Sequence, residues 1–169
     1  LLHILIISFV FLLAPTAHVV SHAGELEDAK EEVRNNPDDA RAHYNLGGAY
    51  VNSGKHKEAI ESYKQAIKIN PDFKEAHYNL GLAYYPLGKH EEAIKSCKQA
   101  IRIDPDFAIA HYNLACYYSL LGNVSKALKS LGEAIDLGLD DIKHIENDSD
   151  LDGLRDEADY KKLINKLKR

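Results

Sequence analysis

The sequence repeats itself with a period of thirty-four residues. Three segments open with the same letters, AHYNL, at Ala42, Ala76 and Ala110. The first two segments stay in parallel through KQAI and end in PDF, so their match extends over most of the period. A repeat of this length is one supersecondary unit that cannot bury its apolar face alone. The units are therefore predicted to stack into a solenoid.

Each unit contains two helical patterns. In the first copy Leu46, Gly47 and Tyr50 lie on one face of a helix, and Gly54 follows as a helix-terminating glycine. Apolar residues then recur at the i, i+3, i+4 and i+7 spacing of an amphipathic helix, namely Ala59, Ile60, Tyr63, Ala66 and Ile67. Pro71 ends this second helix. The sequence predicts an all-α fold.

The repeats resemble the tetratricopeptide repeat (TPR) family. The family pattern of an aromatic residue, Leu-Gly, Tyr, Ala, aromatic, Ala and Pro is met almost completely by the first two copies. The third copy departs from it, with Ala115 in place of the glycine and Leu139 in place of the proline. The resemblance covers residues 40–139. It implies an α-α superhelix of helix-turn-helix repeats and a non-catalytic protein-interaction scaffold, without indicating the partner.

The repeats and the sequence on either side of them divide the chain into six segments. They are a signal peptide or membrane anchor (1–23), an N-terminal capping helix (24–39), TPR 1 (40–73), TPR 2 (74–107), TPR 3 (108–139) and a C-terminal capping segment (140–169). Terminal repeats of a solenoid need such atypical covers. Many bacterial TPR proteins end in a segment that resembles "DLDGLRDEADYKKLINKL". By that resemblance Leu151 and Leu154 fill the last groove, and a closing helix carries Tyr160, Leu163, Ile164 and Leu167.

Residues 1–23 carry no charged side chain apart from histidine. An apolar run from Leu1 to Ala14 is followed by small and polar residues that end in Ala23, which is typical of a secretory signal cleaved after that residue. An uncleaved anchor is the alternative, although the run is shorter than the roughly 20 residues that span a bilayer. The prediction is an exported protein, periplasmic, extracellular or attached to a membrane through residues 1–23.

The charge distribution bears on the class of partner. The net charge is −5, and residues 140–159 hold nine Asp or Glu against Lys143 and Arg155. Nucleic-acid binders instead present a basic face, so no nucleic-acid partner is predicted. The sequence contains no Ser-His-Asp arrangement and no glycine loop that cradles phosphate, and neither catalysis nor a cofactor is predicted.

The first helix of every repeat carries a Tyr-Asn pair. The pairs are Tyr44-Asn45, Tyr78-Asn79 and Tyr112-Asn113. In the TPR family these helices line the concave surface, so the resemblance implies that the pairs face a groove. Asparagine both donates and accepts hydrogen bonds, which suits the backbone of an extended peptide, and tyrosine supplies rigid contact area. Alternatively, YNLG is only family consensus and the asparagines brace the fold. Other predicted groove residues are Arg41, Gly48, Val51, Leu82, Tyr85, Cys116 and Ser119.

Family members that bind the carboxylate tails of chaperones use basic groove residues. Here Tyr44, Glu75, Leu82 and Ile109 occupy those places, and Arg41 is the basic residue that remains. An uncharged or mildly apolar peptide is therefore the predicted ligand. The alternative function is an assembly subunit of the cell envelope that associates, with itself or others, through its convex face or caps.

The aspartates of "DSDLDGLRDEAD" invite comparison with a calcium-binding EF-hand loop. Asp148, Asp150, Asp152 and Asp159 are the candidate ligands. Arg155 occupies a place where EF-hands carry an apolar residue, and Asp159 is shorter than the usual closing glutamate. The favoured interpretation is a capping turn whose aspartates end one helix and begin another, with calcium binding as the alternative.

His43, His77 and His111 recur once per repeat. Successive helices lie roughly 8–10 Å apart, which is too far for such residues to share a zinc ion, so a packing role is predicted. Cys97 and Cys116 are the two cysteines. Cys97 lies on the apolar stripe of a second helix and Cys116 faces the groove; a disulfide between them is the alternative to unpaired thiols.

Overall fold

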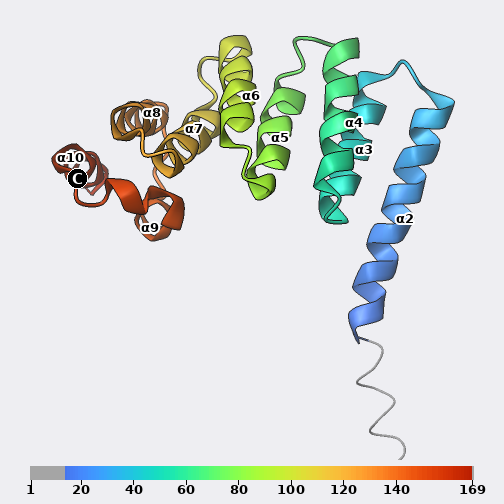
Figure 1. Ribbon diagram of the computed structural model, residues 1–169, viewed down its shortest axis with the longest axis horizontal. Coiled ribbons are helices and arrows are strands. Elements are labelled where there is room, and N and C mark those ends of the chain that lie inside the picture. The colour runs from blue at the N-terminus through green and yellow to red at the C-terminus, as the bar shows by residue number, and fades with distance from the viewer. Residues whose placement is uncertain (1–13, 169) are drawn as a thin grey trace, which may run out of the picture. The chain divides into compact units, whose positions relative to one another are not determined.

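The computed structural model describes residues 14–168, and every regular element within that range is helical (Figure 1). The chain forms two compact units that divide after Asn70. Among the residues described, no helix is both long enough and apolar enough to span a membrane.

The first unit contains α2 (Ala14–Asn35), α3 (Ala40–Asn52) and α4 (His56–Ile69). Leu26 and Ala29 of α2 are buried against Leu46 and Ala49 of α3, so α2 covers the outer face of the first repeat. The N-terminus of α3 is capped by Asp39, whose side chain accepts a hydrogen bond from the backbone N–H of Arg41 at 2.8 Å.

α2 is longer than the capping helix predicted over residues 24–39. It begins at Ala14 and passes through Ala23, the predicted cleavage position. The rest of the predicted export signal, residues 1–13, lies outside the described residues.

The second unit contains the two remaining helix pairs and the C-terminal cap. Its elements are α5 (Lys74–Tyr84), η1 (Tyr85–Leu87), α6 (His90–Ile103), α7 (Ala108–Leu120), α8 (Val124–Asp136), α9 (Ile142–Asn147), η2 (Ser149–Leu154) and α10 (Ala158–Leu167). Pro86 explains why α5 is shorter than α7. Proline cannot donate the backbone bond of a helix interior, and the α-helix gives way to the 3₁₀ turn η1, which Gly88 ends with a φ of 67°.

A hydrogen bond between a histidine and a proline occurs at the same place in each repeat. Nε2 of His43 donates to the carbonyl of Pro37 at 2.9 Å, and His77 does the same to Pro71 at 2.9 Å. His111 donates to the carbonyl of Pro105 at 3.0 Å. The histidine at the start of each first helix therefore fixes the turn that precedes the helix. The sequence predicted only packing for these residues, although their constant spacing of six residues was visible.

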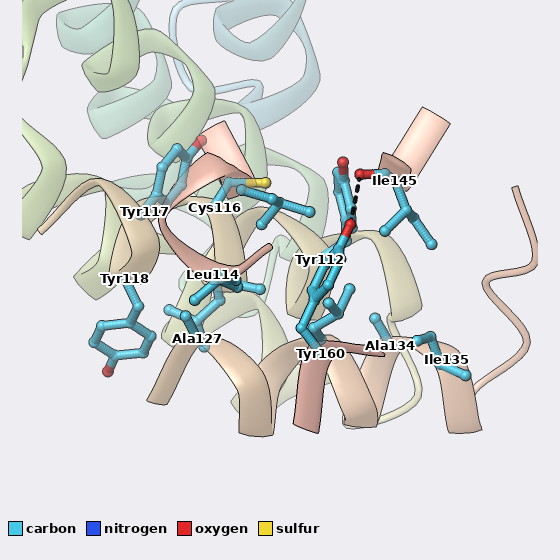
Figure 2. Packing of buried hydrophobic residues seen from close by; sticks show 14 of the residues in the cluster. Tyr112, Leu114, Cys116, Tyr117, Tyr118, Ala127, Ala134, Ile135, Ile145 and Tyr160 are labelled. Atoms are coloured by element: carbon cyan, nitrogen blue, oxygen red, sulfur yellow. Dashed lines mark hydrogen bonds between the residues drawn. The ribbon is translucent and has the colours of Figure 1, made fainter. Parts of the chain in front are cut away.

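The largest apolar core lies where α7, α8 and the C-terminal cap meet (Figure 2). Leu131, Ile145, Leu151 and Leu154 are all fully buried there. η2 packs on α7, and α10 packs on α8. The hydroxyl of Tyr160 donates to the carbonyl of Ile145 at 3.3 Å, drawn as the dashed line in Figure 2. The cap is thus an integral part of the second unit.

Candidate functional site

α5 presents a stripe of side chains at helical spacing. Tyr78 and Leu82 of α5 and Tyr85, the first residue of η1, follow one another at i, i+4 and i+7, which places them on one face of this helical segment. Leu82 is 39% exposed and Tyr85 is 38% exposed, which places both among the exposed large apolar side chains of the described residues. Tyr78 and Asn79 are half-buried. We call these four residues the α5 surface.

Tyr78 is fixed from both sides by α7 and the turn before it. Its ring meets the ring of Phe107 edge-on, with the centroids 5.1 Å apart. Nδ2 of Asn113 donates to the hydroxyl oxygen of Tyr78 at 3.0 Å. Because that bond uses a lone pair of the oxygen, the Tyr78 hydroxyl is still able to donate its own hydrogen. Burial raises the pKa of Tyr78, so the hydroxyl stays protonated.

Tyr85 connects the α5 surface to the C-terminal cap. Its hydroxyl donates to Oδ1 of Asp150 in η2 at 2.9 Å. This bond, followed by partial burial, raises the pKa of Tyr85 to about 12. The ring of Tyr85 lies 5.8 Å from that of Tyr117, centroid to centroid. Tyr85 is therefore held in place while more than a third of it faces solvent.

The predicted groove residues of α7 are covered by the cap. Tyr112 is only 2% exposed and Cys116 only 3%. The Tyr112 hydroxyl donates to Asp148, and Sγ of Cys116 lies 3.6 Å from the same carboxylate oxygen. The other oxygen of Asp148 accepts from the backbone N–H of Asp150 at 2.9 Å, which caps η2. A ligand cannot touch Tyr112 or Cys116 while this segment is in place.

The candidates on α3 have local partners in the first unit. Nδ2 of Asn45 donates to Oε2 of Glu32 at 3.3 Å. The ring of Tyr44 lies 5.8 Å from that of Tyr63. Arg41 and Asn45 are exposed, and Tyr44 is half-buried. These contacts make Asn45 a brace between α2 and α3.

The aspartates considered for calcium do not converge on one point. Asp148 and Asp150 bind the tyrosine hydroxyls already described, whereas Asp152 pairs with Arg155 at 2.7 Å and Asp159 pairs with Lys162 at 2.8 Å. Within residues 14–168 no cluster of three His, Cys, Asp or Glu side chains is arranged to hold a metal ion. The aspartates act in helix capping, ion pairing and tyrosine binding.

Both cysteines are free thiols and both are buried. Burial raises the pKa of Cys97 to about 12. Burial is also the main cause of the raised pKa of Cys116, to which the neighbouring Asp148 adds. A protonated, buried thiol is a poor nucleophile, so the two cysteines serve as small core residues.

The sequence did not reveal that Asp148 and Asp150 are the acceptors of Tyr112 and Tyr85. These partners are thirty-six and sixty-five residues apart. Both hydrogen bonds, Tyr112 to Asp148 and Tyr85 to Asp150, depend on the path of the chain after α8. No local sequence pattern encodes that path.

Comparison with known proteins identifies the family to which the repeats belong. A protein-family model described as TPR repeat matches residues 48–88. Two models described as tetratricopeptide repeat match residues 75–107 and 96–129. No curated protein matches the sequence.

Several solved structures share the fold. A crystal structure of MamA is 30% identical over 66% of this chain and 66% of that chain, with a TM-score of 0.65. A second MamA crystal structure is 27% identical, covers 88% of this chain and 84% of that chain, and has a TM-score of 0.74. The second TPR of Spaghetti (RPAP3), bound to the HSP90 peptide SRMEEVD, is 25% identical with a TM-score of 0.57, over 66% of this chain and 98% of that one.

The chain thus spans 66% of the length of the first MamA structure. The matching family models and the helical fold, found independently, lead to one conclusion: this chain is a tetratricopeptide repeat protein with the all-α superhelical fold of that family.

Proposed function

We propose that this TPR protein is a non-catalytic scaffold that binds an extended segment of a partner protein on the α5 surface. TPR proteins serve as protein-interaction scaffolds, and the RPAP3 structure holds a peptide. The observation that supports this location is the exposure of Leu82 on α5 and of Tyr85 at the start of η1, while the equivalent face of α7 is covered by the cap. Tyrosine is enriched among the residues that contribute most to protein interfaces.

The polar groups beside these residues suit a peptide backbone. The Tyr78 hydroxyl is able to donate to a backbone carbonyl, and its orientation is set by Asn113. Asn79, the residue after Tyr78, carries a half-buried amide. Within the first unit, the exposed residues Arg41 and Asn45 and the half-buried Tyr44 of α3 are separate candidates for contact with the partner.

The test compares two exposed leucines. Leu82→Ser changes the α5 surface, and Leu121→Ser is the matched control, because Leu121 is 42% exposed and lies at the end of α7. The full chain would be used to capture partners from extracts of its own cells, after circular dichroism has shown that both variants fold. We expect the wild type and Leu121→Ser to capture the same partners. Leu82→Ser should fail to capture them. If both variants still capture the partners, the α5 surface is not the binding site.

A second candidate function is association through the C-terminal end. A groove of about 740 Å³ lies between α8 and α10. Val124, Leu128 and Leu163 form its apolar part, and charged side chains including Lys129 and Lys166 surround it. A scaffold that assembles through its cap would use this groove. Sedimentation of wild type and Leu128→Lys would show a change of molecular mass only if the groove joins copies of the chain.

We also propose that the scaffold works outside the cytoplasm, because the apolar run of residues 1–14 and the small residues that follow have the pattern of an export signal. Fractionation of cells that produce the full chain with a C-terminal tag would test this. Recovery in the cytoplasmic fraction alone would contradict it.

A further inference from the structure

We infer that the segment bound on the α5 surface is basic, with a Lys or Arg side chain that pairs with Asp150 at the edge of that surface. The inference rests on the proposed function and adds the chemical class of the ligand to it. Four features of the second unit carry the argument.

First, the carboxylate of Asp150 is held beside the α5 surface. Oδ1 accepts the Tyr85 hydroxyl at 2.9 Å, and the side chain is half-buried. The next residue, Leu151, is fully buried in the core, as is Leu154 at the end of η2. The two buried leucines fix the backbone of η2 in the core, and the bond to Tyr85 orients the Asp150 carboxylate.

Second, the negative charge there has no basic partner from the chain itself. Asp148 and Asp150 accept bonds from hydroxyl, thiol and backbone N–H groups, and no basic side chain within residues 14–168 forms an ion pair with either. Arg155, whose charge also acts on Asp148, is engaged by the Asp152 carboxylate at 2.7 Å and by the carbonyls of Glu146 and Asp148. A cation from outside would therefore meet the Asp150 carboxylate without displacing an ion pair.

Third, the charge of the wider cap has the same sign. Residues 140–159 hold nine acidic side chains against Lys143 and Arg155. A surface of one sign raises the local concentration of ligands of the opposite sign and repels ligands of its own. An acidic peptide such as SRMEEVD, the ligand of the RPAP3 structure, would bring carboxylates towards this segment and bind poorly.

Fourth, the apolar part of the surface suits the stem of a basic side chain. Lys and Arg lay their methylene groups along apolar surface and keep the charged end in polar surroundings. The exposed part of the Tyr85 ring provides that surface next to Asp150. Leu82 continues it along the same helical face. The aromatic face also attracts a cation directly. Charge and shape thus favour the same ligand.

A ligand on the α5 surface does not have to displace the C-terminal cap. Its leucines, Leu151 and Leu154, have no exposed area and belong to the main core of the unit. Releasing η2 would expose both, at the cost typical of losing large buried side chains. The ligand binds beside the cap, with Asp150 as a fixed part of the site.

The experiment is a selection from a phage library of random dodecapeptides on the immobilised full chain. Three variants are used in parallel. Asp150→Asn removes one charge and keeps an oxygen that accepts from Tyr85. Glu91→Gln removes one charge from the exposed start of α6 and serves as the matched control. Leu82→Ser reports on the α5 surface itself.

We expect the selected peptides to be richer in Lys and Arg than the starting library. The most enriched peptide, made as a fluorescent probe, should bind Asp150→Asn about tenfold more weakly, the size of effect expected for one lost charge-assisted hydrogen bond. Glu91→Gln should bind as the wild type does. Binding should also weaken at high salt, because part of the attraction is screened.

Three results would overturn the inference, and they differ in what they leave standing. Selected peptides that are neutral or acidic, or basic peptides that bind Asp150→Asn as tightly as wild type, contradict the basic ligand; if Leu82→Ser abolishes their binding, the proposed function survives. If no selected peptide binds Leu82→Ser more weakly than the wild type, both the basic ligand and the proposed function are contradicted.

Discussion

Gly47 and Gly48 are neighbours on α3, but only one of them lacks room for a side chain. A Cβ atom at Gly47 would lie 2.5 Å from Cε1 of Tyr63 and 2.9 Å from its Cζ, closer than real contacts allow. At Gly48 the nearest atom would be the Tyr63 hydroxyl oxygen at 3.9 Å. The small residue at Gly47 therefore exists so that the ring from α4 can pack against the backbone of α3.

This difference gives a prediction with its own control. We expect Gly47→Ala to lower the free energy of unfolding by about 1–3 kcal/mol through overpacking. Gly48→Ala should raise it by about 0.5–1 kcal/mol, because alanine favours the helix. Urea denaturation followed by circular dichroism measures both. Equal effects at the two positions would show that Tyr63 moves aside without cost.

The bond between Tyr85 and Asp150 predicts a change of stability with pH. The folded state raises the pKa of Tyr85 from 10.0 to about 12, so it holds the phenolic proton more tightly than the unfolded chain does. The stabilisation that results is fully present below pH 10 and is lost as the pH rises towards 12. Wild type should therefore lose, across that interval, the stability it has over Tyr85→Phe. A constant difference between the two proteins would contradict the bond.

At the scale of elements, η2 is the part of the cap that closes the second unit. Leu151 and Leu154 point into the core that α7 and α8 share with it. We expect Leu151→Ala and Leu154→Ala each to lower the free energy of unfolding by about 2–5 kcal/mol. Leu120→Ala is the control, since Leu120 is 41% exposed and its loss should cost little. If the three variants melt alike, η2 is only loosely attached.

The aspartates of the same segment predict the response to calcium. Each has a partner within the chain, and the partners of Asp152 and Asp159 are basic side chains. A calcium ion would have to break these bonds before it could be coordinated by several oxygens. We expect millimolar calcium chloride to leave the melting temperature of the full chain unchanged, with magnesium chloride as the control for ionic strength. A rise specific to calcium, lost in Asp148→Ala, would restore the EF-hand interpretation.

The helix pairs could be predicted from sequence because their signals are local. The apolar spacing in α4, α6 and α8 and the turn glycines recur every thirty-four residues, so each copy supports the assignment of the others. Which of the predicted groove residues are accessible to a ligand could not be predicted in that way. Tyr78 and Tyr112 occupy equivalent positions in two repeats, yet the first lies at an accessible surface and the second is buried. The difference arises from η2, which packs on α7 through contacts between residues distant in the sequence.

At the scale of the whole molecule, the ion pairs are mostly on the surface. Lys162 and Asp159 are 77% and 68% exposed, and Lys166 and Asp136 are 62% and 66% exposed. Exposed pairs of this kind each contribute about 0–1 kcal/mol. The stability of the protein must therefore come mainly from apolar burial, as in the core of α7, α8 and the cap.

Because apolar burial dominates, the free energy of unfolding should depend only weakly on salt concentration. Between low and high sodium chloride the free energy of unfolding should change by less than about 1 kcal/mol, because screening acts on contributions that are small. Urea denaturation in the two buffers is the measurement. A large loss of stability in salt would mean that the surface charges form a cooperative network.

The histidine-to-proline bond has a consequence for how the chain is made. It joins residues only six apart, as with His77 and Pro71, so both partners leave the ribosome within moments of each other. Contacts so close in sequence form without a long loop having to close. The direction of each first helix can therefore be set before the residues that will cover it have been synthesised, and the molecule can be assembled one repeat at a time, in the order of translation.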